Sequence, residues 1–152
     1  MYFSGMEKDI DMEMKTINEL QDEIVEEFLE LDDWMDRYQL LIDMGGELEP
    51  MDDSMKTEQN LIDGCQSRVW INADCIDGCL VMTAESDALI VKGIIALLLR
   101  VLNNQTPRDI LDSELYFIDR IGLRDHLSPT RSNGLLAMVK RIHDYAVAYE
   151  AE

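Results

Sequence analysis

One cysteine stands in a setting that suits a nucleophile. Cys65 lies within the stretch 61–70, LIDGCQSRVW, between an apolar pair and a run rich in strand-forming residues. Its neighbours supply a backbone position free to turn tightly, hydrogen-bond donors and a positive charge: Gly64, Gln66, Ser67 and Arg68. The thiolate is the reactive form of cysteine, so reactivity requires a lowered pKa and controlled access. From the residues alone, a reactive thiol and an inert core cysteine both remain open.

The other two cysteines offer a second arrangement that carries chemistry in some proteins. Cys75 and Cys79 have the spacing C-x-x-x-C, which suits a metal pair or a redox pair. A zinc site needs two further ligands at matched spacing, and His126 and His143 fall in distant helical segments. A cysteine hydrolase would need one of these histidines beside Cys65 and an acid to orient it. We expect no metal site, and we expect His143 on the polar side of its helix.

Composition and charge exclude several classes of protein. The chain has 152 residues, 47% of them hydrophobic, and a net charge of −19, with 19 of its 32 acidic residues in 1–60. Such a surface repels nucleic acid and anionic lipid. Two interpretations stay open: a solvated surface without a partner, and a surface that steers a basic protein partner. No apolar run reaches the roughly 20 residues of a membrane span. Three cysteines are too few, and odd in number, for a disulfide framework, so a reducing, cytoplasmic location is expected.

The segments that position Cys65 are predicted from periodicity and capping signals. Thr16 and Glu19 form a capping box for an amphipathic helix over 16–31. Asp32 or Asp33 caps a second helix, which Gly45-Gly46 ends, and the two helices form a hairpin. Strands are expected at 58–62, 68–73 and 79–84, the last two joined by a turn at Asp77-Gly78.

The second half of the chain is predicted to be mostly helical. Ser86 is expected to cap a nearly all-apolar, buried helix over 88–102, with Asp87 in its first turn. Further helices begin at Pro107 and at Ser128-Pro129. Because strands and helices are segregated, the fold class is α+β: a small antiparallel sheet of about three strands packed on helices. Residues 1–15 are expected to be an acidic flexible arm, and 16–152 a single domain.

Five blocks of the sequence resemble segments of one known family. The stretch 60–70, Asn60-Leu61-Ile62-Asp63-Gly64-Cys65-Gln66-Ser67-Arg68-Val69-Trp70, resembles the N-x-I-x-G-C-Q-S-x-V-W of the SufE family of sulfur acceptors, which includes CsdE. Four other blocks resemble family segments in the right order: 34–45, 86–96, 106–110 and 126–135. The last of them, His126-Leu127-Ser128-Pro129-Thr130-Arg131, is similar to H-L-x-P-x-R. The resemblance covers about 16–150.

The resemblance implies both a fold and a role. The fold would be shared with IscU-type scaffolds. The protein would accept persulfide sulfur on Cys65 from a PLP-dependent cysteine desulfurase of the SufS/CsdA kind, activate that enzyme, and pass the sulfur to iron–sulfur cluster assembly. It would be a carrier, a monomer or weak homodimer, with no cofactor of its own. Arg131 would support the loop or the thiolate. The residues implied to contact the partner are Gly64, Gln66, Ser67 and Asp87.

Two alternatives remain open from the sequence. An iron–sulfur cluster scaffold of the IscU type would need several convergent ligands, whereas Cys75 and Cys79 are predicted in a hairpin away from Cys65. A cysteine-dependent hydrolase or transferase would need a histidine within hydrogen-bond reach of Cys65.

Overall fold

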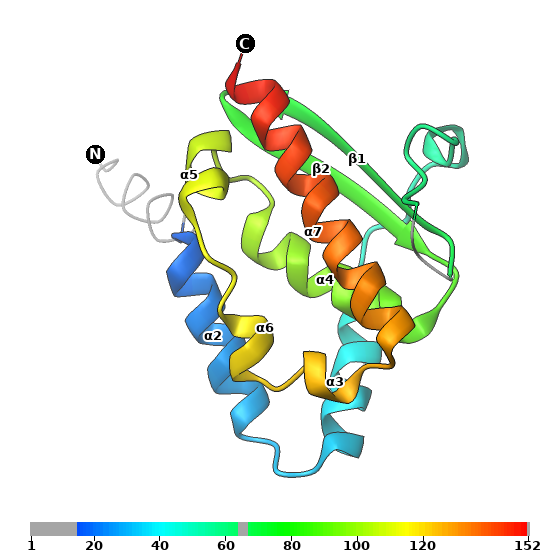
Figure 1. Ribbon diagram of the computed structural model, residues 1–152, viewed down its shortest axis with the longest axis vertical. Coiled ribbons are helices and arrows are strands. Elements are labelled where there is room, and N and C mark those ends of the chain that lie inside the picture. The colour runs from blue at the N-terminus through cyan, green and yellow to red at the C-terminus, as the bar shows by residue number, and fades with distance from the viewer. Residues whose placement is uncertain (1–14, 64–66, 152) are drawn as a thin grey trace, which may run out of the picture.

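The chain folds into a two-stranded hairpin with helices packed against it (Figure 1). We describe it from a computed structural model, which covers residues 15–63 and 67–151. Residues 1–14, expected with Lys15 to form an acidic arm, lie outside these ranges. In chain order the elements are α2 (Ile17–Leu29), α3 (Trp34–Gly46), the 3₁₀ turn η1 (Asp53–Met55), β1 (Val69–Ile76), β2 (Cys79–Ser86), α4 (Leu89–Leu102), α5 (Pro107–Asp112), α6 (Phe117–Arg120), the 3₁₀ turn η2 (Arg124–His126) and α7 (Pro129–Glu150). The predicted α+β class is confirmed.

The capping signals place the first two helices as expected. The N–H of Glu19 donates to Thr16 Oγ1 at 3.1 Å, and the N–H of Thr16 donates to Glu19 Oε1 at 3.0 Å, so the capping box is complete. Asp33 is the residue that caps α3, because its carboxylate accepts the N–H of Met35 at 2.9 Å. Short side chains at these positions satisfy N–H groups that the first helical turn leaves free.

The sheet has two strands in the described residues. β1 and β2 pair antiparallel from Val69–Ser86 to Ile76–Cys79. Asp77 and Gly78 join them with φ of 53° and 82°, the left-handed pair that a two-residue hairpin turn requires. The strand expected at 58–62 is reduced to a single bridge between Leu61 and Trp70. It does not extend further because residues 58–60 form a turn, which the N–H of Leu61 closes by donating to the carbonyl of Thr57 at 3.0 Å.

The start of α4 differs from the prediction. The helix begins at Leu89, with Ala88 as a cap that makes no side-chain hydrogen bond. Ser86, expected as the cap, is instead the last residue of β2, buried and paired with Val69. Its hydroxyl accepts the N–H of Ala88 at 3.2 Å. This hydrogen bond closes a turn after the strand, and such a turn is an alternative to a helix that starts at Ser86. Asp87 therefore lies in the connection before α4 and not in its first turn.

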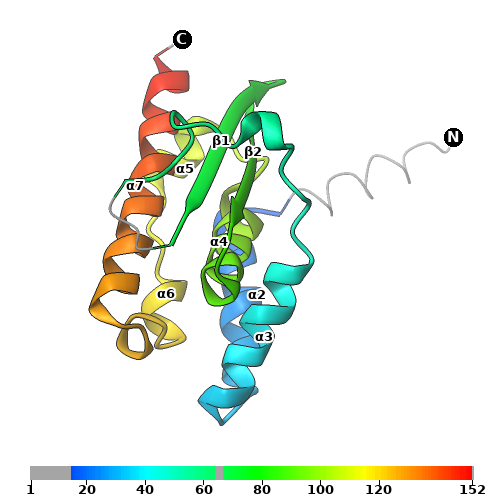
Figure 2. The same cartoon turned by 90° about the vertical axis from the view of Figure 1, so that its right-hand side faces the viewer.

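The helices form layers around α4. α4 packs on β2 and α7 packs on β1, while α2 and α3 lie on the other side of α4. In Figure 2, α7 stands at one side of the molecule, α3 at the other, and α4 between them. Close approach of α3 and α4 depends on Gly45 and Gly93, since a Cβ at Gly93 would lie 2.2 Å from the Leu41 carbonyl oxygen. No helix of the described residues is both long and apolar enough to cross a membrane.

Candidate functional site

The connection that carries Cys65 comprises residues 63–68 and is flanked by two buried residues. Gly64, Cys65 and Gln66 lie outside the described residues. Before them, Ile62 is 5% exposed, and after them Val69 is fully buried. The N–H of Ile62 donates to the carbonyl of Val69 at 2.8 Å and closes the connection at its base. A second bond, from the N–H of Ile71 to the carbonyl of Asn60 at 2.9 Å, continues that pairing along β1.

A reciprocal pair of hydrogen bonds fixes the far end of the connection. The N–H of Arg68 donates to Asp87 Oδ1 at 3.1 Å, and the N–H of Asp87 donates to the carbonyl of Arg68 at 3.4 Å. Both side chains are exposed, and Ser67 beside them is half-buried. The sequence singled out Asp87 and Ser67, and the structure brings these two predicted site residues to the same corner of the sheet.

Helix α7 supports the other side of this corner through three donors. The Arg141 guanidinium donates to the carbonyls of Gln59 and Leu61, both at 3.0 Å. Two tyrosine hydroxyls continue the row at steps of four residues: Tyr145 donates to the Ile71 carbonyl at 3.0 Å and Tyr149 to the Ala73 carbonyl at 3.1 Å. Residues four apart share one helix face, so the row follows β1.

Sequence reasoning missed Arg141, because its acceptors are backbone carbonyls with no residue-type signature. One signal was present. The positions 141, 145 and 149 form a polar or amphipathic stripe directly beside the core stripe of α7, where Met138, Ile142 and Ala146 are buried. Long side chains beside a buried stripe can lie along its apolar surface and place their polar ends on backbone groups of the neighbouring element.

Arg131 lies apart from these contacts. It is exposed in the first turn of α7, where its N–H donates to Ser128 Oγ at 3.3 Å. Its guanidinium forms no hydrogen bond or ion pair with residues 15–63 or 67–151. From Arg141, the helical rise carries Arg131 about 15 Å along the axis, in the direction that leads past the start of β1. The end of α7 that bears Arg131 therefore lies past the start of β1, the strand end at which Val69 pairs with Ile62.

Comparison with known proteins assigns the fold and the family. Residues 22–146 match the family model described as SufE, Fe-S metabolism associated domain. The chain belongs to the SufE family. An uncharacterized SufE-like protein of Rhizobium meliloti is 37% identical over 130 residues, which are 82% of this chain and 93% of that protein. An uncharacterized SufE-like protein of Synechocystis sp. is 39% identical over 127 residues, 84% and 80% of the two chains.

A solved structure supports the fold independently. The solution structure of a hypothetical protein from Thermus thermophilus superposes with a TM-score of 0.73. The match covers 88% of this SufE-family chain and 97% of the other, at 22% identity. At that identity the likeness shows that the two proteins share a fold. The resemblance to the SufE family that the sequence motifs indicated is confirmed by the family model and the curated relatives.

The two histidines of this SufE-family chain occupy separate places. His126 Nδ1 lies 2.9 Å from the Gly122 carbonyl oxygen, and its ring stacks on Trp34 with centroids 3.8 Å apart. His143 is exposed, as expected, and borders a cavity of about 270 Å³ that residues of α4, α5 and α6 also line. His143 follows Arg141 by two residues, so it projects to a different side of α7 from the side that contacts β1.

Cys75 and Cys79 lie at the opposite end of the hairpin from the Cys65 connection. Cys75 pairs with Leu80 and Cys79 with Ile76, so the two thiols project from opposite faces of the sheet. The rise of a strand places them about 20 Å from Val69. Within the described part of the chain, no three His, Cys, Asp or Glu side chains gather as metal ligands do. The cluster-scaffold alternative gains no support from these two cysteines.

Proposed function

We propose that this protein accepts sulfane sulfur on Cys65 from the persulfide of a PLP-dependent cysteine desulfurase and carries it to iron–sulfur cluster assembly. Membership of a family associated with Fe–S metabolism supports the pathway. The structural observation that carries the proposal is the anchored base of the Cys65 connection, closed by Ile62 and Val69 and tied by Arg68 and Asp87. A short connection with fixed ends can present one thiol to a partner.

The transfer is a thiolate exchange in which atoms and electrons balance. The Cys65 thiolate attacks the terminal sulfur of the desulfurase persulfide. One S–S bond forms on Cys65 as the S–S bond on the desulfurase breaks, and the desulfurase cysteine leaves as a thiolate. No external oxidant or reductant enters the step. PLP belongs to the desulfurase, and the role of this chain is to supply the acceptor sulfur and the surface that docks beside it.

Shelter is the second requirement, because a persulfide is open to reduction and further oxidation. Buried Ile62 and Val69 flank the connection and place it at the edge of the hydrophobic core. We infer that a persulfide on Cys65 gains its shelter from this apolar edge and from the docked desulfurase. Arg131 supports the loop or the thiolate from the end of α7. Gly64, Gln66, Ser67 and Asp87 contact the desulfurase.

Intact mass after incubation with a cysteine desulfurase, PLP and cysteine tests the proposal. The expected result is a gain of one sulfur, about 32 Da, which is lost on treatment with thiol. The Cys65→Ser protein is expected to gain nothing. The matched controls are Cys75→Ser and Cys79→Ser, which keep Cys65 and are expected to gain the sulfur as the unaltered chain does. Thiol-labile sulfur on the Cys65→Ser protein would contradict the assignment.

A further inference from the structure

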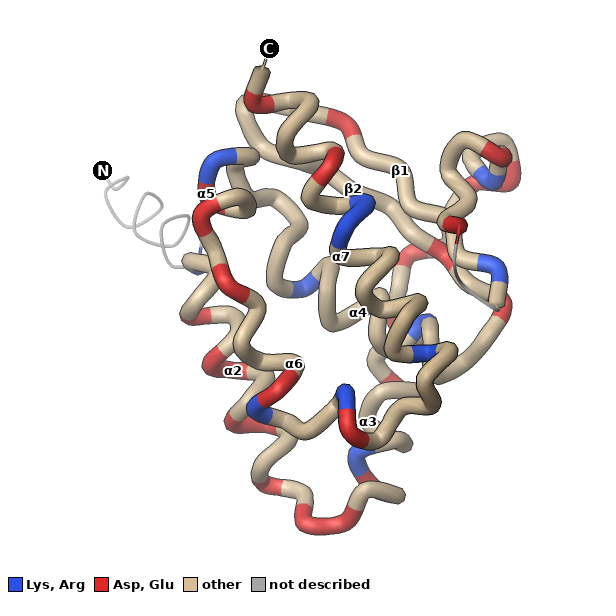
Figure 3. Tube along the Cα trace, in the orientation of Figure 1, with Lys and Arg blue, Asp and Glu red and all other residues tan. Residues whose placement is uncertain are grey.

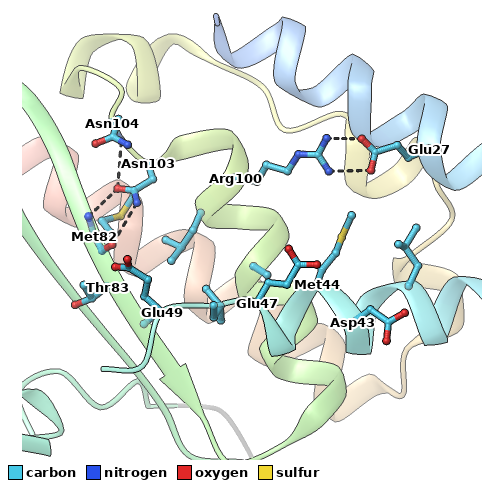
Figure 4. A pocket seen from close by; sticks show the side chains of 15 residues that line it. Glu27, Asp43, Met44, Glu47, Glu49, Met82, Thr83, Arg100, Asn103 and Asn104 are labelled. Atoms are coloured by element: carbon cyan, nitrogen blue, oxygen red, sulfur yellow. Dashed lines mark hydrogen bonds and ion pairs between the residues drawn. The ribbon is translucent and has the colours of Figure 1, made fainter. Parts of the chain in front are cut away.

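A groove lies along the other edge of the sheet, between α3, β2 and the second half of α4 (Figure 4). Its volume is about 730 Å³. The floor is apolar and consists of Leu40, Met44, Leu48, Met82, Ala84, Ala96 and Leu99. The rim is polar and mostly acidic, with Glu27, Asp43, Glu47 and Glu49 around it.

The acidic side chains of the rim are largely uncompensated. Arg100 is the one basic residue among the described residues that line the groove, and it is bound to Glu27 by two hydrogen bonds and to Glu23 at 3.4 Å. Figure 4 shows the Arg100–Glu27 pair at one end of the groove, with Glu47 and Glu49 apart from it. Asp43, Glu47 and Glu49 form no ion pair with any described residue. Acidic residues also recur along α2 and the turn that follows it (Figure 3).

The outer edge of β2 has unpaired backbone groups facing the groove at one described residue, Ala84. The segment after α4 satisfies this edge further along: Asn103 Oδ1 accepts the N–H of Met82 at 2.7 Å, and the Gln105 carbonyl accepts that of Leu80 at 2.9 Å. Ala84, two residues beyond Met82, presents its N–H and C=O in the same direction. Among the described residues neither group has a partner on that side. The Thr83 hydroxyl oxygen is also buried and lacks a hydrogen-bond partner among them.

We propose that this groove binds a basic, amphipathic segment of a partner protein. The apolar floor takes the apolar side chains of that segment, and its Lys or Arg side chains pair with Asp43, Glu47 and Glu49. Ala84 offers the segment one place for backbone hydrogen bonds. Charge complementarity selects this occupant, because a second copy of the chain carries −19 and the segment 1–14 is itself acidic.

The groove and the Cys65 connection lie on different edges of the sheet. The groove borders β2, whereas the connection leads into β1 on the side that α7 covers. One partner can therefore occupy the groove while another contacts Cys65. Binding in the groove needs no thiol, so the Cys65→Ser protein is expected to bind the basic segment with unchanged affinity. Failure of the persulfide proposal would leave this one standing, and the reverse also holds.

Titration of ¹⁵N-labelled protein with three synthetic peptides tests the inference by NMR. The probe alternates lysine and leucine over eight residues; the controls replace its leucines by serine or its lysines by glutamate. The lysine–leucine peptide is expected to shift the amides of Met44, Leu48 and Ala84, and its affinity should fall as salt rises. The lysine–serine peptide should bind at least about tenfold more weakly, because it lacks apolar contacts.

A pair of charge-matched double variants locates the binding. Glu47→Gln with Glu49→Gln is expected to weaken the lysine–leucine peptide about tenfold. Glu26→Gln with Glu114→Gln removes the same charge at exposed positions outside the groove and should leave the affinity within twofold. Equal weakening in both double variants, or shifts confined to other surfaces, would overturn the proposal. So would a dilution series without peptide that moves the groove amides, since a second copy would then be the occupant.

Discussion

The backbone of Arg68 forms two hydrogen bonds with Asp87. The Asp87 carboxylate accepts the Arg68 N–H at 3.1 Å, and the Asp87 N–H donates to the Arg68 carbonyl at 3.4 Å. These bonds join the end of the Cys65 connection, at Arg68, to the residue that follows β2. Asp87 thus has two separable properties: an oxygen that accepts a hydrogen bond and a negative charge at the surface.

Substitutions at Asp87 separate those two properties. Asp87→Ala removes both, and we expect faster hydrogen exchange at the Arg68 amide and a loss of about 1 kcal/mol in the free energy of unfolding. Asp87→Asn keeps an acceptor oxygen and removes the charge. If Asp87 serves to fix the connection, Asp87→Asn will accept sulfur almost normally. A deficit in Asp87→Asn as large as in Asp87→Ala, measured by sulfur transfer from the desulfurase, would assign the role to the charge instead.

Arg141 is predicted to hold the approach to Cys65. Arg141→Met keeps the apolar stem but loses both bonds to the Gln59 and Leu61 carbonyls, at a cost of about 1–2 kcal/mol in the free energy of unfolding. Hydrogen exchange should rise over residues 59–62, and the rate of sulfur acceptance should fall. Arg141→Lys should recover only part of the loss, because an ammonium is a single point donor and cannot span two carbonyls as a planar guanidinium does. Unchanged exchange in Arg141→Met would remove the assignment.

Arg131 is predicted to behave in the opposite way. Its side chain is exposed and makes no hydrogen bond or ion pair with the described part of the chain. Arg131→Ala should therefore leave the free energy of unfolding within about 0.5 kcal/mol of the unaltered value. The rate of sulfur acceptance should nevertheless drop several-fold, as followed by mass over time. Equal rates for Arg131→Ala and the unaltered chain would end the proposal that Arg131 supports the loop or the thiolate.

The contact between α3 and α4 is predicted to tolerate no side chain at Gly93. Gly93→Ala would place a Cβ 2.2 Å from the Leu41 carbonyl oxygen, so the two helices would have to separate. We expect a loss of about 3 kcal/mol, measured by urea unfolding. Gly46→Ala is the matched control, since nothing lies within 4 Å of its Cβ position. It should be neutral or slightly stabilising, because alanine favours helix over glycine.

Acid is predicted to weaken the tie between α2 and its neighbours at Glu23. The hydrogen bond from Lys15 lowers the pKa of Glu23 from its usual value of 4.5, and Arg100 lowers it further, against a raising effect of burial. A lowered pKa means that the stabilisation is complete above pH 4.5 and disappears as the pH falls through the lowered value. The stability difference between the unaltered chain and Glu23→Gln should therefore be largest near neutrality and shrink as the pH falls below 4.5. A difference that grew with acid would contradict this.

Local signals in the sequence were sufficient for most of the fold. Thr16 with Glu19, Asp33, and the Asp77-Gly78 turn each specify a backbone conformation through atoms only a few residues apart, and all three are confirmed. The prediction of Ser86 as a helix cap is wrong because serine suits both a helix cap and a turn after a strand. Pairing with Val69, which lies 17 residues earlier in the sequence, decides between them.

The site was harder to predict than the fold. The residue types around Cys65 pointed to a reactive thiol, and the family motifs pointed to its role, but neither reveals what anchors the connection. Arg141 acts on carbonyls 80 and 82 residues away in the sequence. The strand expected at 58–62 fails for a local reason, because the turn that brings the Leu61 N–H to the Thr57 carbonyl leaves a single bridge, to Trp70.

The row of donors on α7 also sets an order of events when the chain is made. Arg141, Tyr145 and Tyr149 cover backbone carbonyls that were synthesised 74 to 82 residues earlier. At the usual pace of translation, about 5–20 residues per second, that interval lasts roughly 4 to 16 s. Through those seconds the Ile71 and Ala73 carbonyls at this edge of β1 lack their α7 donors and are open to an extended chain nearby. The arrival of α7 covers these carbonyls and closes that route to misassembly.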